Sequence, residues 1–283
     1  MCFTYNDAEN YASKIKERFD FVTPKAIGES RCKRNIEALC MGEGDGSVLF
    51  MSDFADTSAV SAKILLTFFE RLCIAYKNDL KISAIKIRSI LRERKIVVIP
   101  LTNPDGSEIS HFGYEGARCY GGLVRRAADG KYSQWVSNAR GVDLRLNFPY
   151  RFAEAECDAE KPSASGYKGP AEASETETKA VISLCSELKP KHAVILSRSG
   201  KYISCQSPKS CSDCAMMTQV FKSVSELPIK RIKPQSAYGS FGGWFAQSFC
   251  APVFDFSLSE RDGTEFDRLY KRYEELLILS AIM

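Results

Sequence analysis

Histidine is almost absent from this chain, with only His111 and His192 among 283 residues. A zinc site with several histidine ligands is therefore excluded unless the fold brings these two together. Long apolar runs are missing too, and none approaches the roughly 20 residues of a membrane-spanning helix. The first residues lack a basic stretch followed by an apolar one, so no secretory signal is visible. We therefore expect a cytoplasmic protein without membrane association.

Strong charge of either sign is also missing. The 39 Lys and Arg residues nearly balance 35 Asp and Glu residues, which leaves a net charge of +4. The basic residues are scattered, and Arg125-Arg126 and Lys230-Arg231 are the tightest pairs. Nucleic-acid binding normally concentrates basic residues on one face. We therefore expect neither a nucleic-acid partner nor a strongly acidic one.

The eleven cysteines are odd in number and irregularly spaced. Without an export signal, reduced thiols fit this pattern better than a disulfide framework. Cys205, Cys211 and Cys214 have a spacing that could supply three ligands to a structural zinc ion, but no fourth ligand is visible nearby. We favour reduced, partly buried thiols and leave the zinc alternative open.

Short apolar runs alternate with amphipathic stretches along the chain. The runs at 48–51, 96–99, 193–196 and 253–256 are typical of buried strands, and weaker strands are expected at 26–28, 36–40 and 202–205. Helices are predicted at 7–19, 58–76, 82–92, 211–224, 244–249 and 266–277. A capping box, Ser174-x-x-Glu177, should start another helix that ends near Leu188. This alternation predicts an α/β sheet covered by helices on both faces.

Regular patterning nearly vanishes between Thr102 and Gly169. A loop of this length is usually functional or carries small elements of its own. No repeat or linker interrupts the chain, so we expect one domain over 1–283, with 1–20 as an N-terminal helical extension. Ligands of such sheets bind at the carboxyl ends of the strands, which here are 51–57, 101–106, 197–200 and 257–260.

Two charges stand among apolar residues in the segment 140–149. They are Asp143 and Arg145, and each is costly to bury unless it is paired. From spacing alone, the simplest interpretation is a loop held by salt bridges.

Several motifs occur in an order that resembles the zinc carboxypeptidase family, and especially its bacterial branch that cuts γ-D-glutamyl-diaminopimelate bonds in cell-wall peptides. The resemblance extends from about Ala26 to Ala281. Its motifs are Ile27-Gly28-x-Ser30, Arg34-x-Ile36-x-Ala38-Leu39, Ile99-Pro100-x-x-Asn103-Pro104-Asp105-Gly106, Trp135-x-x-Asn138-Ala139-Arg140-Gly141-Val142-Asp143-Leu144, Asn147-Phe148-Pro149, Tyr167-x-Gly169-Pro170, Ser174-Glu175-Thr176-Glu177-Thr178 and Gly239-x-x-Gly242-Gly243-Trp244-Phe245. The resemblance implies a three-layer α/β/α fold with a central mixed β-sheet, of the phosphorylase/hydrolase-like type.

By resemblance, the family's chemistry requires one zinc ion held by two histidines and a glutamate, with a second glutamate as the base. In this chain the ligand positions correspond to Phe54, Thr57 and Ser197, and the position of the base corresponds to Ser257. His192 begins the strand that leads to Ser197 and lies about 16 Å from it along the strand axis. We therefore expect no metal, no cofactor and no residue with the family's hydrolytic role.

Other positions of the implied substrate site have also changed. The family's Asn-Arg pair for the substrate carboxylate corresponds to Arg145-Leu146, so the arginine is shifted by one residue, which on a strand would reverse its facing. The family's substrate-clamping tyrosine has no clear counterpart in this chain, where Gln235 or Tyr238 is the nearest residue to that position. Asp143 corresponds to the aspartate that orients a zinc-bound histidine. That histidine is Phe54 here, so we expect Asp143 to have a new partner: Arg145, Arg140 or a backbone amide.

Two rival sites remain open. Asp53, Asp56, Asp143 and Asp255 could form a carboxylate site for magnesium, calcium or manganese. Aspartates near strand ends are more often turn and cap residues, and Asp56 has the position of a helix N-cap. A serine nucleophile among Ser197, Ser199 and Ser257 is not favoured, because no Gly-x-Ser-x-Gly motif is present.

The favoured hypothesis is a carboxypeptidase-like pseudoenzyme that retains binding of a peptide or muropeptide in its cleft. Its candidate cleft residues are Phe54, Thr57, Asp143, Arg145, Ser197, Tyr238 and Asp255. The second hypothesis is an active hydrolase with a rebuilt metal site. The third is a structural, partner-binding domain in which Phe54 fills the former zinc cavity.

Overall fold

A computed structural model describes residues 3–208, 211–225, 227–258 and 266–283. Its centre is a seven-stranded mixed sheet with the order β1-β2-β6-β3-β7-β9-β8. The strands are β1 (Thr23–Glu29), β2 (Asn35–Met41), β3 (Gly46–Ser52), β6 (Arg94–Ile99), β7 (His192–Ser197), β8 (Tyr202–Gln206) and β9 (Val253–Ser257). The four central strands β6, β3, β7 and β9 run parallel, whereas β2 and β8 each pair antiparallel with their inner neighbours. The predicted mixed sheet is confirmed.

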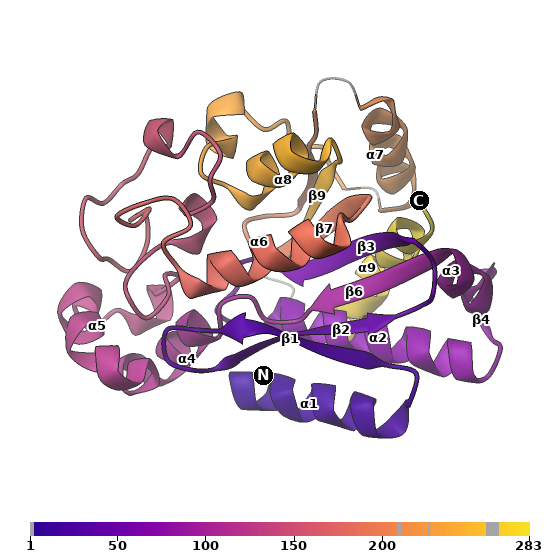
Figure 1. The fold of residues 1–283 in the computed structure, drawn as a ribbon, viewed down its shortest axis with the longest axis horizontal. Coiled ribbons are helices and arrows are strands. Elements are labelled where there is room, and N and C mark those ends of the chain that lie inside the picture. The colour runs from indigo at the N-terminus through magenta and orange to yellow at the C-terminus, as the bar shows by residue number, and fades with distance from the viewer. Residues whose placement is uncertain (1–2, 209–210, 226, 259–265) are drawn as a thin grey trace.

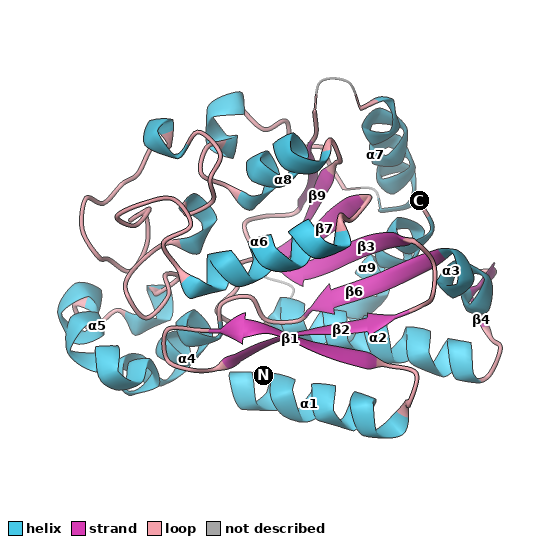
Figure 2. Ribbon diagram, in the orientation of Figure 1, coloured by secondary structure: helices cyan, strands magenta, loops and turns pink. Residues whose placement is uncertain are grey.

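Helices cover both faces of the sheet (Figures 1 and 2). Behind it lie α2 (Val60–Lys77) and α9 (Phe266–Ile282), which share one apolar cluster with α1 (Tyr5–Arg18), α3 (Ile87–Glu93) and α7 (Ser212–Ser225). In front lie α6 (Thr176–Leu188) and α8 (Phe241–Phe249), which form a second cluster. Alternate residues of β3 enter the two clusters, because successive side chains of a strand point to opposite faces. The three-layer α/β/α prediction is confirmed.

Two local predictions are wrong. The helix predicted at 82–92 begins only at Ile87, because the strands β4 (Lys81–Ile82) and β5 (Ile85–Lys86) form a small hairpin before it. The predicted capping box is also absent, since the N-cap of α6 is Glu175 and no side chain caps the helix. The Ser174 hydroxyl instead donates to the Glu175 carboxylate (2.8 Å).

The weakly patterned stretch after Thr102 carries small elements of its own, as one of the two alternatives predicted. They are α4 (Pro104–Phe112), η1 (Gly113–Tyr120), α5 (Gly121–Ala128), η2 (Tyr132–Gln134), η3 (Leu144–Leu146) and η4 (Phe152–Glu154). A third apolar cluster around the fully buried Trp135 holds the first part of this stretch together. One further 3-10 turn, η5 (Pro234–Ala237), precedes α8.

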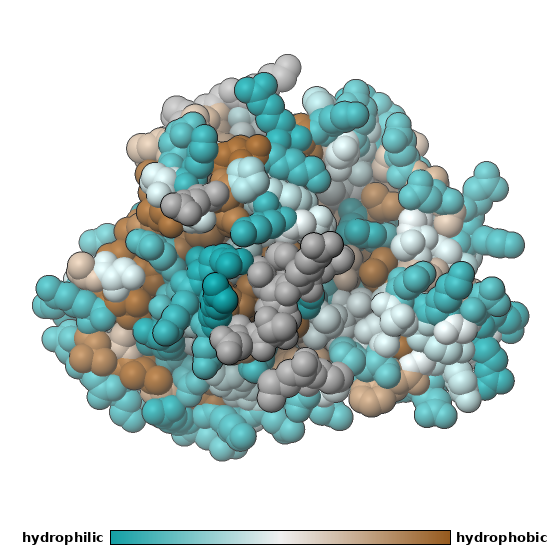
Figure 3. All heavy atoms as spheres, turned by 180° about the vertical axis from the view of Figure 1, so that it is seen from behind, coloured by the Kyte–Doolittle hydropathy of each residue, from teal (hydrophilic) through white to brown (hydrophobic). Residues whose placement is uncertain are grey.

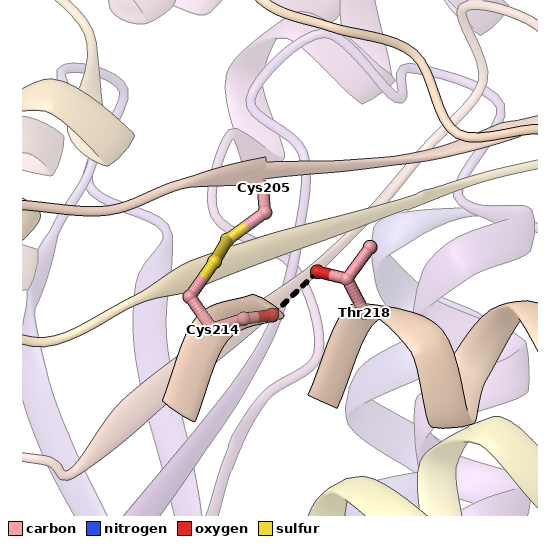
Figure 4. The surroundings of a disulfide bond; sticks show 3 residues. All are labelled: Cys205, Cys214 and Thr218. Atoms are coloured by element: carbon pink, nitrogen blue, oxygen red, sulfur yellow. Dashed lines mark hydrogen bonds between the residues drawn. A yellow bond between two sulfur atoms is a disulfide. The ribbon is translucent and has the colours of Figure 1, made fainter. Parts of the chain in front are cut away.

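Cys205 on β8 and Cys214 on α7 form a disulfide bond (Figure 4). The expectation of reduced thiols is therefore wrong for this pair, which sequence spacing could not identify because α7 folds back onto the edge strand. The other cysteines within the described ranges are free, and Cys211 is partly buried. Since two of its three sulfurs are bonded to each other, the structure does not support the zinc site of Cys205, Cys211 and Cys214 that the sequence left open.

The surface seen from behind is mainly hydrophilic, with hydrophobic residues gathered chiefly at the upper left (Figure 3). Within the described part of the chain, no helix combines the length and the apolar character needed to span a bilayer.

Candidate functional site

A cavity of about 420 Å³ lies at the carboxyl ends of β3 and β7. Its lining includes two acidic side chains, two basic ones and three hydroxyls, namely Asp53, Asp56, Arg145, Arg198, Thr57, Ser58 and Ser199. The cavity therefore offers partners for both the negative and the positive groups of a polar ligand.

The turn after β3 supplies one wall of this cavity. The amide of Asp53 donates to the carbonyl of Leu196 (2.9 Å), which holds the turn against β7. The Asp56 carboxylate accepts from the Ser61 amide (2.7 Å) and the Ser58 hydroxyl (2.6 Å). The N-cap of α2 is Ala59 and not Asp56, which the sequence predicted. The Asp56 carboxylate nevertheless accepts a hydrogen bond from the first turn of the helix, through the Ser61 amide.

Phe54 does not line the cavity and instead packs into the core. Its side chain is buried, and its ring centroid lies 5.4 Å from that of Phe148. Phe148 in turn contacts Phe241 (5.5 Å) and Trp244 (5.7 Å) from α8. Phe54 thus belongs to an aromatic cluster in front of the sheet.

Asp143 is held by two of the three kinds of partner that the sequence left open, Arg145 and a backbone amide. The guanidinium of Arg145 donates from Nε (2.9 Å) and Nη2 (2.6 Å) to the buried Asp143 carboxylate. The Gly166 amide donates to the same carboxylate (3.0 Å). Burial opposes the charge of Arg145, but the hydrogen bond to Asp143 and the negative charges of Asp143 and Asp53 together outweigh it and raise the pKa of Arg145. Arg140 binds Glu175 instead (3.2 Å).

Arg145 reaches the cavity despite its shifted register. The segment is the 3-10 turn η3 rather than a strand, so the facing reversal expected for a strand does not apply. The side chain of Arg145 remains 43% exposed. It can therefore contact a ligand while it stays paired with Asp143.

Three serines and a tyrosine gather where β7, β9 and β8 meet. Ser199 Oγ lies 3.3 Å from Ser197 Oγ, 3.2 Å from Ser257 Oγ and 2.6 Å from the Tyr202 hydroxyl. The two histidines lie elsewhere, since His192 Nε2 contacts the Ser280 carbonyl (2.9 Å) at the opposite end of β7. This hydroxyl cluster has no imidazole base, which is against a serine nucleophile.

Tyr238 lies apart from this group. Its hydroxyl accepts a hydrogen bond from Arg151 (2.6 Å), and the Arg151 guanidinium lies 4.3 Å from its ring centroid. The ring also contacts Tyr150, with 6.0 Å between centroids. Tyr238 is not among the residues that line the cavity.

Arg198 is a cavity residue that the motif comparison missed. It follows β7 directly and donates to the hydroxyl of Ser58 (2.9 Å), another residue of the cavity lining. The sequence did give one indication of its role, because Arg198 lies in the segment 197–200 at a strand end, where ligands of such sheets bind.

Comparison with known proteins settles the family. The zinc carboxypeptidase family matches residues 8–243, which is most of the chain. This chain belongs to the zinc carboxypeptidase family. The relative γ-D-glutamyl-L-diamino acid endopeptidase 1 of Lysinibacillus sphaericus is 21% identical over 281 residues, covering 95% of this chain and 69% of that protein. The uncharacterized protein YqgT of Bacillus subtilis is 25% identical over 256 residues, covering 87% of this chain and 67% of that protein.

Solved structures support the fold. Thrombin activatable fibrinolysis inhibitor superposes with a TM-score of 0.77 at 17% identity, covering 99% of this chain and 73% of that one. Murein-tripeptide amidase MpaA from Escherichia coli O157 superposes with a TM-score of 0.55 at 19% identity, covering 91% of each chain. This zinc carboxypeptidase homologue therefore has the architecture that its motifs implied.

The residues present do not fit the family's zinc ion. Phe54 has no donor atom, and Thr57 and Ser197 offer only neutral hydroxyls at the other positions implied by resemblance. Within the residues that the structure describes, no three His, Cys, Asp or Glu side chains are grouped so that they could hold a metal ion. The alternative carboxylate site of Asp53, Asp56, Asp143 and Asp255 is likewise not assembled among them.

Two carboxyl groups near the cavity, those of Asp255 and Asp53, have pKa values well above the ordinary value for aspartate. Burial raises the pKa of Asp255 to about 7, against a partial opposing effect of its hydrogen bond with Ser197. Burial likewise raises the pKa of Asp53 to about 6, and Arg145 opposes this rise. Burial therefore disfavours the ionised form of both groups, and near pH 7 Asp255 is only partly ionised.

We expect Asp255→Asn to raise the free energy of unfolding by about 2 kcal/mol at pH 8. The folded pKa of about 7 exceeds the ordinary value of 3.8, so the parent loses stability progressively as pH rises from about 4 to about 7. The asparagine variant escapes this loss, and its advantage should vanish below pH 4. Urea titrations at pH 4, 5.5 and 8 measure the difference, and equal differences at all three would contradict the assignment.

Proposed function

We propose that this zinc carboxypeptidase homologue has lost zinc binding and peptidase activity and binds a peptide or muropeptide in the strand-end cavity. The observation that carries the proposal is the position of Phe54. By resemblance it occupies the place of the first zinc ligand, yet its ring packs against Phe148 in the core. By resemblance, Thr57 stands where the family has a glutamate ligand, Ser197 where it has a histidine ligand and Ser257 where it has the glutamate base. A neutral hydroxyl cannot take over any of these roles.

The cavity supports retained binding. Its volume of about 420 Å³ favours this proposal over a purely structural domain with a closed cleft. Arg145 and Arg198 supply positive charge for the carboxylates of a peptide, and Asp53 supplies negative charge for an amine. The relative from Lysinibacillus sphaericus is named for γ-D-glutamyl-L-diamino acid peptides, and the structural neighbour from Escherichia coli for a murein tripeptide.

The test combines metal content, turnover and binding. After equilibration with zinc and dialysis, mass spectrometry is expected to find far less than one zinc per chain, and incubation with γ-D-glutamyl-diaminopimelate peptides is expected to give no hydrolysis above buffer. Calorimetric titration with the same peptides should detect binding. The Lysinibacillus sphaericus relative, treated identically, is the control.

Two outcomes would contradict the proposal in different ways. Stoichiometric zinc, manganese or magnesium with peptide turnover would establish an active hydrolase with a rebuilt site. Absence of metal, turnover and peptide binding together would favour a structural, partner-binding domain.

A further inference from the structure

We propose that Cys205, Cys211 and Cys214 form a thiol–disulfide exchange site whose ligand is a low-molecular-weight thiol. The structure shows this site with Cys205 bonded to Cys214 and with Cys211 free. A small thiol opens this bond, and Cys211 then closes a new one with Cys205. The inference goes beyond the proposed peptide binding and does not depend on it.

The three cysteines lie at the edge of the sheet, where α7 packs against β8. Cys205 belongs to β8, and Cys214 is the third residue of α7 (Figure 4). Cys211 directly precedes this helix, and the residue before a helix lies on the same side of the first turn as the third residue within it. All three side chains contact the apolar cluster behind the sheet. A free thiol therefore shares the surroundings of the bonded pair.

Cys205 is the end of the disulfide that a thiol can reach. Cys205 and Cys211 are partly exposed, whereas Cys214 is only 8% exposed. Attack is therefore expected at the sulfur of Cys205, with the sulfur of Cys214 as the leaving group. A protein thiol needs a more exposed disulfide, because its own chain must approach the bond. The partial burial of this pair therefore favours a small thiol over a protein one.

The start of α7 favours the thiolate that this attack releases. Cys214 lies in the first turn of a helix of 14 residues. Free backbone N–H groups and the helix dipole stabilise negative charge in the first turn. A thiolate stabilised in this way is the better leaving group in disulfide exchange.

The exchange conserves the number of disulfide bonds. In the first step the thiolate RS⁻ bonds to Cys205 Sγ, and the electron pair of the broken bond goes to Cys214 Sγ. In the second step the Cys211 thiolate bonds to Cys205 Sγ, and RS⁻ leaves with the electron pair of the mixed disulfide. The proton that Cys211 releases balances the one that Cys214 takes up. The small thiol is regenerated, so no oxidant or reductant is consumed, and β8 stays bonded to the start of α7.

The other cysteines of the described ranges lack this combination. Four are buried, and burial raises the pKa of their thiols, which leaves little thiolate to react: Cys32, Cys40, Cys73 and Cys185. Three are exposed but free, so they offer no bond to exchange: Cys119, Cys157 and Cys250. Disulfide exchange is therefore expected at the edge of the sheet between β8 and α7.

The experiment maps the disulfide bonds of the full chain, purified without reductant, after incubation with reduced glutathione at pH 7.5. Acid quenching, labelling of free thiols with N-ethylmaleimide and mass spectrometry identify the bonded pairs. In the parent protein, the Cys205–Cys211 bond and a labelled Cys214 are expected beside the original bond. In Cys211→Ser the original bond closes again, so labelling of Cys214 should fall several-fold. The exposed Cys250→Ser control should behave as the parent.

A second variant tests directly whether the new bond can form. Cys214→Ser, incubated with oxidised glutathione, is expected to form the Cys205–Cys211 bond through a mixed disulfide. Absence of this bond in both the parent and Cys214→Ser, or unchanged Cys214 labelling in Cys211→Ser, overturns the exchange site. Opening of the bond by a protein dithiol such as thioredoxin, but not by glutathione, overturns the assignment of a small thiol. Thermal unfolding of Cys211→Ser within about 2 °C of the parent shows that lost exchange reflects the missing thiol.

Discussion

Replacing Asp105 with alanine is expected to lower the free energy of unfolding by about 3–5 kcal/mol. Oδ1 of this fully buried carboxylate accepts hydrogen bonds from the Ser30 hydroxyl (2.7 Å) and Arg34 Nη1 (2.7 Å), and Oδ2 accepts from the Cys32 amide (2.9 Å). The alanine variant leaves the buried Arg34 charge without its main partner. Urea titration monitored by circular dichroism measures the loss, with an unchanged slope if unfolding stays two-state.

Two controls identify the cause of this loss. Alanine at the exposed Asp45 should change stability by no more than about 0.5 kcal/mol. Adding Arg34→Met to Asp105→Ala should recover part of the stability, because it removes the unpaired charge. A loss below about 1 kcal/mol in Asp105→Ala would show that this ion pair is replaced easily and does not hold the first two strands to α4.

The motifs that reveal the family are structural. The Asn103 side chain accepts from the Gly106 amide (2.9 Å) and donates to the Phe54 carbonyl (2.9 Å), so it fixes the turn below the cavity. Asn138 donates to the Glu175 carboxylate (2.8 Å) and accepts from the Val142 amide (3.2 Å). These contacts depend on packing and not on zinc. A chain can therefore keep them, and keep its recognisable sequence, whichever residues stand at the positions of the zinc ligands.

The sheet was predictable because apolar runs at 48–51, 96–99, 193–196 and 253–256 each fall within a strand. The small helices between Thr102 and Gly169 were not, because their stability comes from a cluster around Trp135 and not from periodicity. Arg145 was one of three partners that the sequence offered for Asp143, since the two residues are close in the chain. The sequence placed Asp53 and Asp255 near one strand-end pocket, but that β7 lies between their strands is known only from the sheet order.

Replacing Phe54 with alanine is expected to lower the free energy of unfolding by about 3–5 kcal/mol. The ring is buried between the sheet and the aromatic side chains in front of it, and its truncation leaves a cavity beside Phe148. Chemical denaturation measures the loss. Phe112→Ala is the matched control, because this ring is 52% exposed and should contribute about 0.5 kcal/mol or less.

The same position distinguishes a core residue from a vacant ligand position. If Phe54 serves packing, Phe54→Leu should cost much less than Phe54→His, because leucine keeps the apolar contacts and a buried imidazole needs a hydrogen-bond partner. The histidine variant should also remain free of zinc, since Thr57 and Ser197 still offer only neutral hydroxyls. A histidine variant as stable as the leucine one would contradict this assignment. It would mean that polar space suited to a metal ligand persists beside β3.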